Sequence, residues 1–332
     1  MLKHRYTAGI RLIRFVVAIA TMLISAVVIT PATPANAEPV TCQMGAYIVS
    51  LSRVDTAGGT FDADLWMWSL CPDEKIEPLK TMEFVNSVKV TSSLDTTLQR
   101  GDQWWSLRKI TGTFRQDFDL SNYPFDRQRL TIDTEDAVLY ARDLAFTADT
   151  ADSKVDPGIK LKNWKIDSFS ITAGEVTHPT AYGDPDLAGV DSTYPQLRLE
   201  IGLQRGVHVA DFLKATFVVY IAALLALVSL MVFDGRVGLL GAATFTVVLS
   251  FVSLDRLLGP HDELYLLDKI HFAALAVIAV AGAWGVRSSR LVSLGADKAR
   301  VHKLDARAAI VLLVIYILLN VILVASAIRG VR

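Results

Sequence analysis

The 332-residue chain has few of the residues that build catalytic or metal sites. It contains six histidines and two cysteines, and only one of those histidines, His178, lies between residues 38 and 207. Zinc sites draw mainly on histidine and cysteine ligands, so that stretch has no histidine cluster to bind a metal. Its serine-rich turns have no general base nearby. We therefore expect no metal, no cofactor and no enzymatic activity.

The chain also lacks the positive charge that nucleic-acid binding requires. Residues 38–207 carry 26 acidic and 17 basic side chains, whereas residues 208–332 carry 8 and 12. An acidic first half argues against nucleic acid as a partner, because phosphate contacts depend on lysine and arginine. An acidic vestibule would instead concentrate cations, although most single charges are simply solvated.

The first 37 residues have the pattern of a secretory signal. Four basic residues precede an apolar stretch over residues 15–30, and Ala35-Asn36-Ala37 forms a small-residue cleavage site. The alternative is an uncleaved anchor, but the cleavage site favours removal. The mature chain would then begin near Glu38, outside the cytoplasm.

Residues 38–207 show short runs of alternating apolar residues, which predicts an all-β immunoglobulin-like sandwich. The expected strands are 45–52, 61–70, 82–90, 105–114, 130–133, 164–172 and 196–203, with loops over 149–157 and 177–193. If the first hairpin folds about Ala57, positions whose numbers sum to about 113 face each other. Cys42 and Cys71 satisfy that sum, which predicts a disulfide in an oxidising compartment. Two buried free thiols are the alternative.

Aromatic and acidic residues suggest where this domain binds a ligand. Trp66 and Trp68 lie two apart on one expected strand and so share a face. Tyr182 lies in the long loop, and Asp133 and Glu135 in an acidic turn that begins at the end of the expected fifth strand. Core packing explains many aromatics, and acidic turns are often only solvated. An aromatic box for a cationic or amphipathic ligand is the sharper hypothesis.

Residues 208–332 contain four apolar segments of membrane-spanning length, at about 212–233, 237–254, 264–286 and 308–328. Residues 287–307 carry six basic and two acidic side chains, so the positive-inside rule places this loop in the cytoplasm. Four crossings then place the C-terminus outside, on the side of the β domain.

The stretch Asn122-Tyr123-Pro124-Phe125-Asp126-Arg127-Gln128 reads locally as a tight turn, because proline fixes its own φ and keeps the preceding residue extended. Followed by four spans, it resembles the signature loop of the bacterial pentameric ligand-gated ion channels, the Cys-loop receptor superfamily. The resemblance covers about residues 40–328. It also rests on the hairpin over 47–68, on Glu83-Phe84-Val85-Asn86, and on the spacing from Arg236 through Gly259 to Asp268. The loop cysteines of animal members would fall at Gln116 and Leu130, so that disulfide is absent.

The resemblance implies roles for particular residues. Arg205 would meet the acid of the signature loop, Asp126, and coupling to the membrane helices would run through Tyr123, Pro124, Phe125, Gly259 and Pro260. The pore-lining face of the second span would carry Gly238, Ala242, Phe245, Leu249 and Val252, which share one helix face. Polarity alone favours a different face, with Thr246, Ser250 and Ser253, and hydroxyl residues also serve helix packing. Asp234 would form a ring of negative charge at the cytoplasmic mouth, next to Arg236.

The expected protein is thus a homopentamer in the plasma (inner) membrane that conducts monovalent cations. A small molecule or protons, acting between neighbouring β domains, would open it. Phe245 and Leu249 would form hydrophobic constrictions. The rival hypothesis is a non-conducting membrane receptor or assembly module of the same fold.

Overall fold

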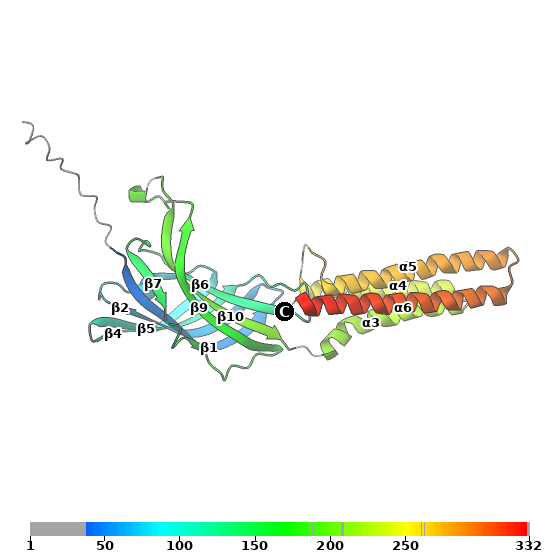
Figure 1. Cartoon of the computed structure of the whole chain (residues 1–332), viewed down its shortest axis with the longest axis horizontal. Coiled ribbons are helices and arrows are strands. Elements are labelled where there is room, and N and C mark those ends of the chain that lie inside the picture. Colours follow the sequence, from blue (N-terminus) through cyan, green and yellow to red (C-terminus); the bar gives the residue numbers. More distant parts are fainter. Residues whose placement is uncertain (1–37, 188, 207–208, 260, 262, 331–332) are drawn as a thin grey trace, which may run out of the picture. The chain divides into compact units, whose positions relative to one another are not determined.

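A computed structural model describes residues 38–330 apart from residues 188, 207–208, 260 and 262. The predicted signal sequence and Pro260 lie outside the described residues. The chain forms a β region of two sheets, followed by four long helices (Figure 1).

The first sheet contains six strands. They are β1 (Val40–Asp55), β2 (Thr60–Cys71), β4 (Ser87–Arg100), β5 (Gln103–Arg115), β7 (Leu144–Ala148) and β8 (Lys154–Val155). The order is β4-β5-β2-β1-β7, with β8 also paired to β1. Strands β7 and β8 run parallel to β1, and the other pairs are antiparallel. We call it sheet A.

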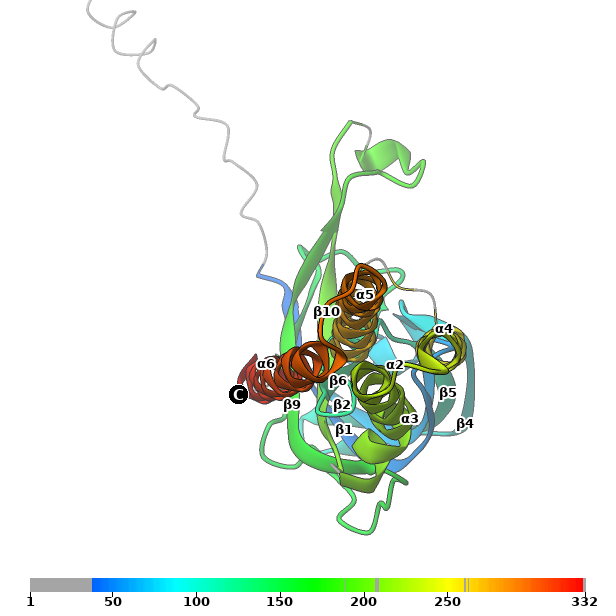
Figure 2. The same ribbon diagram turned by 90° about the vertical axis from the view of Figure 1, so that its right-hand side faces the viewer.

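The second sheet, sheet B, contains four antiparallel strands in the order β3-β6-β10-β9. They are β3 (Met82–Phe84), β6 (Arg127–Asp136), β9 (Trp164–His178) and β10 (Ser192–Arg205). The ends of β9 and β10 project as a hairpin arm beyond the sheets (Figure 2). A short 3-10 helix, η1 (Pro185–Leu187), lies between these two strands.

The apolar core of the β region lies between the two sheets. Every second residue of β2, from Phe61 to Cys71, is buried, and the alternate residues are partly exposed. Sheet B contributes Leu130 and Ile132 from β6 and Leu199 from β10, all fully buried in the same cluster. The predicted two-periodic pattern therefore corresponds to a sandwich in which each sheet keeps one face for the core.

The predicted disulfide is confirmed. Cys42 and Cys71 are bonded, with Cα atoms 4.5 Å apart, and close the open end of the β1–β2 hairpin. Gln43 pairs with Leu70, which matches the predicted register, and bulges nearer the turn shift the pairing to Asp55 opposite Thr60. A β-bulge adds a residue to one strand, and alternation along a single strand does not reveal it.

Three sequence expectations about this region were wrong. The run 82–90 is not one strand: β3 joins sheet B and β4 joins sheet A, because Asn86 turns the chain and bonds to the Arg115 and Thr131 carbonyls at 3.1 and 2.8 Å. The acidic turn at 133–136 is the end of strand β6, where Glu135 and Asp136 are buried. The loop predicted over 177–193 is shorter, because Thr177 pairs with Thr193.

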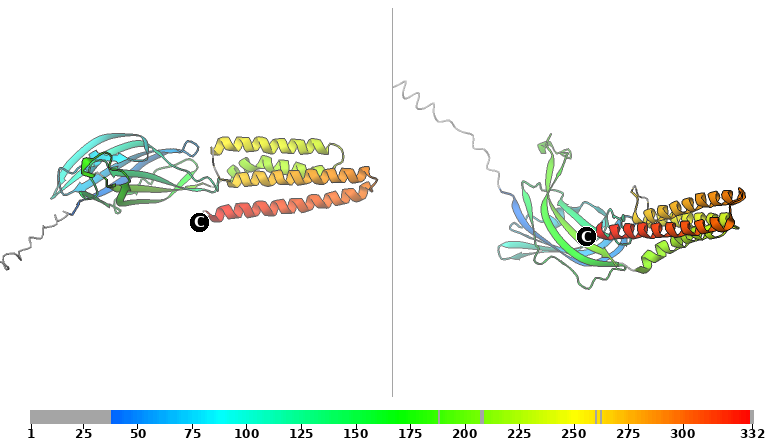
Figure 3. Two further views of the ribbon diagram at one scale, coloured as in Figure 1. Left: turned by 90° about the horizontal axis from the view of Figure 1, so that it is seen from above. Right: turned by 45° about the vertical axis from the view of Figure 1, so that its right-hand side comes forward.

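Four helices follow: α3 (Val209–Val228), α4 (Arg236–Leu258), α5 (Leu266–Ser293) and α6 (Lys298–Gly330), with a 3-10 turn, η2 (Ser229–Met231), after α3. They run side by side (Figure 3). All four are long and apolar enough to cross a membrane. The prediction that residues 287–307 form a loop was wrong, because α5 and α6 extend through most of this stretch. Lysine and arginine are good helix formers, so charge did not end these helices.

A buried ion pair joins α4, α5, α6 and the η2 turn at one end of the bundle. Arg236 Nη2 lies 3.0 Å from Asp305 Oδ2, and the remaining Arg236 donors bond to carbonyls of Ser229, Val232, Leu230 and Gly285. Asp305 also accepts bonds from Trp284 and Ser288 on α5. A Cβ on Gly285 would lie 2.8 Å from Arg236 Cδ, so the glycine leaves room for the arginine.

Candidate functional site

A hollow at the edge of sheet B brings together acidic and aromatic side chains. It encloses about 240 Å³ and is lined by Glu83, Glu135, Asp136, Ala137, Tyr182 and Tyr194. The rings of Tyr182 and Tyr194 lie 6.4 Å apart, and the Tyr194 ring lies 5.1 Å from that of Tyr140. A concave site with π faces and carboxylates suits a cationic or amphipathic ligand.

His178 connects the acidic wall of this hollow to its aromatic wall. Its Nε2 lies 2.9 Å from Oε2 of Glu135, which is 7% exposed as a side chain. Its ring meets Tyr182 edge-on at a centroid distance of 5.8 Å. Tyr182 has a φ of 49°, in the left-handed region, and its ring is exposed. The hairpin arm thus carries Tyr182 over a pocket whose floor comes from β6.

The arm is fastened to the loop after β6 by a strong hydrogen bond. The Tyr140 hydroxyl donates to Asp184 Oδ2 at 2.5 Å. This bond raises the pKa of Tyr140 and lowers the pKa of Asp184, because it stabilises the neutral phenol beside an ionised carboxylate. Asp184 also accepts a bond from the backbone N–H of Asp186, which lowers its pKa further.

The other residues predicted for the ligand site lie elsewhere in the chain. Asp133 does not line the hollow and pairs with Arg198 at 2.5 Å. Trp66 and Trp68 lie on the face of sheet A that is turned away from the core. Trp68 Nε1 donates to Asp149 at 3.1 Å, and Lys109 Nζ lies 5.9 Å from the centre of the Trp66 ring. A single chain therefore brings together only Glu135 and Tyr182 of the predicted ligand residues.

Sequence reasoning missed Tyr140 and gave Tyr194 and His178 no role. Tyr194 lines the hollow, and Tyr140 and His178 lie beside it. They meet there because β10 pairs with both β6 and β9, and because the Ala141 N–H donates to the Thr193 carbonyl at 2.8 Å. The signal that could have identified His178 is that it is the only histidine among residues 38–207. The pairing of Tyr140 with a residue 44 positions later was not visible in any local pattern.

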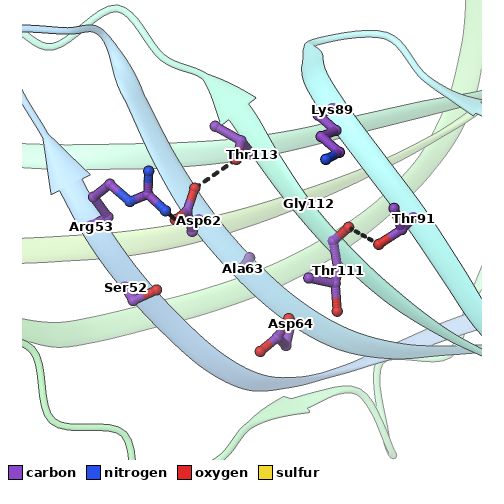
Figure 4. A pocket seen from close by; sticks show the side chains of 10 residues that line it. All are labelled: Ser52, Arg53, Asp62, Ala63, Asp64, Lys89, Thr91, Thr111, Gly112 and Thr113. Carbon is purple, nitrogen blue, oxygen red and sulfur yellow. Dashed lines mark hydrogen bonds and ion pairs between the residues drawn. The ribbon is translucent and has the colours of Figure 1, made fainter.

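A second, polar hollow lies on the outer face of sheet A (Figure 4). It encloses about 320 Å³, and two of its four charged residues pair with each other. Arg53 pairs with Asp62 at 2.8 Å, and Asp62 accepts a bond from Thr113 at 2.7 Å. None of the lining residues labelled in Figure 4 is aromatic, so this hollow is the weaker candidate for a cationic ligand.

The signature-like loop between β5 and β6 contacts the helices. Phe118, Leu120, Tyr123 and Phe125 belong to the apolar cluster of the helical bundle, and the Phe125 ring lies 5.5 Å from that of Phe212. The Leu266 N–H donates to the Ser121 carbonyl at 2.8 Å. The Tyr123-Pro124 peptide bond is cis. The loop thus touches both the start of α3 and the start of α5.

Asp126, in the same loop, forms a buried two-point ion pair with Arg205, the last residue of β10. Nε and Nη2 of Arg205 lie 2.6 and 3.0 Å from the two carboxylate oxygens. The guanidinium also lies 4.0 Å from the Trp164 ring and 4.9 Å from the Tyr123 ring. At Gly259, a Cβ would lie 3.7 Å from the Ala57 carbonyl oxygen. Three β-region segments therefore meet the helices here.

Helix α4 has two different faces. Ala243, Val247 and Leu254 are buried against the bundle. The opposite face, which contains the five predicted pore residues Gly238, Ala242, Phe245, Leu249 and Val252, is exposed. Ser250 of the polar alternative is instead hydrogen-bonded to His271 on α5 at 3.0 Å. Asp234 is exposed, whereas Arg236 is buried on the bundle side.

No protein-family model and no curated protein sequence matches this chain. The function has to be inferred from these residues and their geometry.

Proposed function

We propose that the chain assembles as a homopentameric ligand-gated channel for monovalent cations, with an immunoglobulin-like β region outside the cytoplasm. The exposed face of α4 is the observation that carries this proposal. A membrane helix that keeps small and apolar residues unpacked on the face opposite its bundle can line a central pore when copies assemble around an axis. A pore lined at Phe245 and Leu249 would close by dewetting.

The ligand would bind where two β regions meet. The hollow formed by Glu135, Tyr182 and Tyr194 supplies one wall, and Trp66 and Trp68 of a neighbouring copy supply the other. Two half-sites on different sheets explain why one chain does not gather all these residues. A small cationic molecule fits the rings and carboxylates, and protons are the second candidate.

Gating would pass through the loop that touches the helices. A ligand favours the state in which its two walls lie closer, so its differential affinity supplies the energy. Sheet B would move the Asp126–Arg205 pair, and the Tyr123–Phe125 segment would transmit that movement to α3 and α5. Gly259 lies against the β1–β2 turn and would carry the same movement to α4.

Cation selectivity would come from Asp234. The Arg236 charge is neutralised by Asp305 inside the bundle, so only the carboxylate of Asp234 would face ions at the mouth of the pore. The acidic β region would add to the local cation concentration. A secretory signal and four spans would place the protein in the plasma membrane, with the basic end of α5 and α6 in the cytoplasm.

Ionic current tests the proposal directly. Purified protein in planar bilayers under a salt gradient should give a current that reverses near the cation equilibrium potential after acidification or addition of small amines. Phe245→Ala should open a leak without agonist, since it removes the constriction. Phe251→Ala is the matched control, because that ring packs on His271 and Phe272 within the chain.

The alternative is a non-conducting receptor with the same fold. The oily face of α4 favours it, because a pore lined by Phe245, Leu249 and Val252 has no polar residue between its ends. Protein that is pentameric by mass yet silent in every condition, including as Phe245→Ala, would support the receptor and contradict the channel.

A further inference from the structure

One segment of the acidic β region has the opposite charge. Residues 154–165 contain four lysines, Lys154, Lys160, Lys162 and Lys165, and one acid, Asp156. All four lysine side chains are exposed. None of the four has an ion-pair partner among the described residues. The proposed function makes no use of this charge.

Backbone contacts place the segment next to the start of the first membrane helix. The Gly206 N–H donates to the Asn163 carbonyl at 2.8 Å. The predicted span within α3 begins at Asp211. A chain extends by at most about 3.6 Å per residue, so Asn163 lies within roughly 20 Å of the beginning of that span. The lysines on either side of Asn163 are therefore within reach of the membrane surface.

The same segment surrounds an amphipathic pocket of about 410 Å³. Its apolar lining comes from Val155, Pro157, Ile159, Leu161, Trp164 and Ile166, and its polar rim from Asp156, Lys160 and Lys165. One Asp156 oxygen is occupied by the Gly158 N–H at 2.7 Å, which reduces its repulsion of an anion. Tryptophan and lysine together are typical of the membrane–water interface.

We propose that residues 155–166 bind the headgroup of an anionic phospholipid in the leaflet that faces the β region. Lys160 and Lys165 contact the phosphate, and the apolar wall around Ile159 and Leu161 contacts the glycerol and upper acyl chain. The charge of the segment, its distance from the span and the mixed lining of the pocket all match such a lipid. The site does not depend on whether the protein conducts ions.

The proposed lipid is distinguished from other ligands by its two parts, the charged phosphate group and the apolar chain. A free phosphate ester would use the lysines but leave the apolar wall uncovered, whereas a zwitterionic lipid would cover the wall but gain little from two lysines. Each lysine near an anionic surface strengthens binding about five-fold. Removing two should therefore weaken binding of an anionic lipid by roughly thirty-fold, with little change for a zwitterionic lipid.

The experiment uses the full-length protein in neutral detergent with short-chain phosphatidylglycerol as the probe. Binding is read as slower hydrogen exchange of the amides in residues 156–166, which localises the effect to this segment. Parallel titrations use short-chain phosphatidylcholine and glycerol phosphate. The test variant is Lys160→Gln/Lys165→Gln. The matched control is Lys75→Gln/Lys80→Gln. Both lysines are exposed and follow Cys71, the last residue of β2. The other end of β2 is the one that follows the turn at Ala57, which contacts Gly259 next to the helices.

The proposal predicts saturable protection by phosphatidylglycerol, weak protection by phosphatidylcholine or glycerol phosphate, and a roughly thirty-fold loss in the test variant alone. Equal protection by phosphatidylcholine would overturn the role of charge. Equal affinity for glycerol phosphate would overturn the lipid and leave a phosphate site. The same loss in the control variant would show non-specific attraction and overturn the site.

Discussion

Leu65 and Leu249 are the same residue in two very different settings. Leu65 in β2 is fully buried between the sheets, whereas Leu249 in α4 is 50% exposed. The contrast holds for the whole regions around them. The β region keeps its largest apolar side chains, such as Phe61 and Phe114, inside its own core, while the helices leave many leucine, isoleucine and valine side chains on the surface.

The difference shows what each region still needs from its surroundings. The β region has its own core and a disulfide, which are sufficient for a domain of this size. In the helical region 56% of the apolar window of α5 is buried within the chain, but only 17% of that of α4 and of α6. Lipid is expected to cover α6. The exposed face of α4, by our proposal, lines a pore that forms when several copies assemble.

The largest effect is expected from breaking the ion pair between Arg236 and Asp305, because both charges are buried and each needs the other as its partner. Asp305→Asn leaves the Arg236 charge buried without its partner. This should lower the free energy of unfolding of the helical region by about 3–5 kcal/mol. Denaturation in detergent, followed by the helical circular dichroism signal, measures the change.

Two comparisons make the Asp305 result specific. Asp102→Asn, at an exposed turn between β4 and β5, removes the same charge and should change stability by less than about 0.5 kcal/mol. Replacing both partners, as in Arg236→Met/Asp305→Leu, should restore most of the loss, because no unpaired charge remains. An unchanged stability of Asp305→Asn would mean that the bundle does not depend on this pair.

The two leucines give the next largest effect and test the comparison itself. Leu65→Ala leaves a cavity between the sheets and should lower the stability of the β region by about 2–5 kcal/mol. Leu249→Ala removes the same atoms from an exposed face and should change stability by less than about 0.5 kcal/mol. Thermal unfolding of both variants in detergent measures the difference. A large loss at Leu249 would show that α4 packs its outer face tightly against something.

The sequence was sufficient for the elements whose signal is local. Spacing along one segment was enough for the alternation in β2 and for the hydropathy of the four helices. It was also enough to pair Cys42 with Cys71, since these residues lie at equivalent distances on either side of one hairpin turn. The division of residues 82–90 between two sheets depends on the side chain of Asn86, which bonds to strands far away in the sequence. No periodicity contains that information.

The candidate site was predictable only in part, for a related reason. Tyr182 and Glu135 were identified from residue type, but the hollow exists because β9, β10 and the loop after β6 bring His178, Tyr194 and Tyr140 beside them. The acidic residues at 133–136 look solvated in sequence, since carboxylates are mostly exposed. Glu135 is buried because His178 satisfies it, and that partner lies 43 residues away.

The smallest effect concerns the hairpin arm, where one part-buried hydrogen bond depends on pH. Hydrogen bonding from Tyr140 lowers the pKa of Asp184, so the bond contributes fully above the ordinary aspartate pKa of about 4 and is lost as pH falls through the lowered value. The pKa of Tyr140 is raised, so its contribution is complete below about pH 10 and is lost only as pH rises through the raised value.

Carboxyl NMR titration should place the Asp184 pKa below its ordinary value in the parent and nearer that value in Tyr140→Phe. Tyr194→Phe keeps the bond and should leave the Asp184 pKa lowered. If both variants titrate alike, the arm is held by something other than the Tyr140–Asp184 bond, and Tyr182 is positioned over the hollow by ring packing alone.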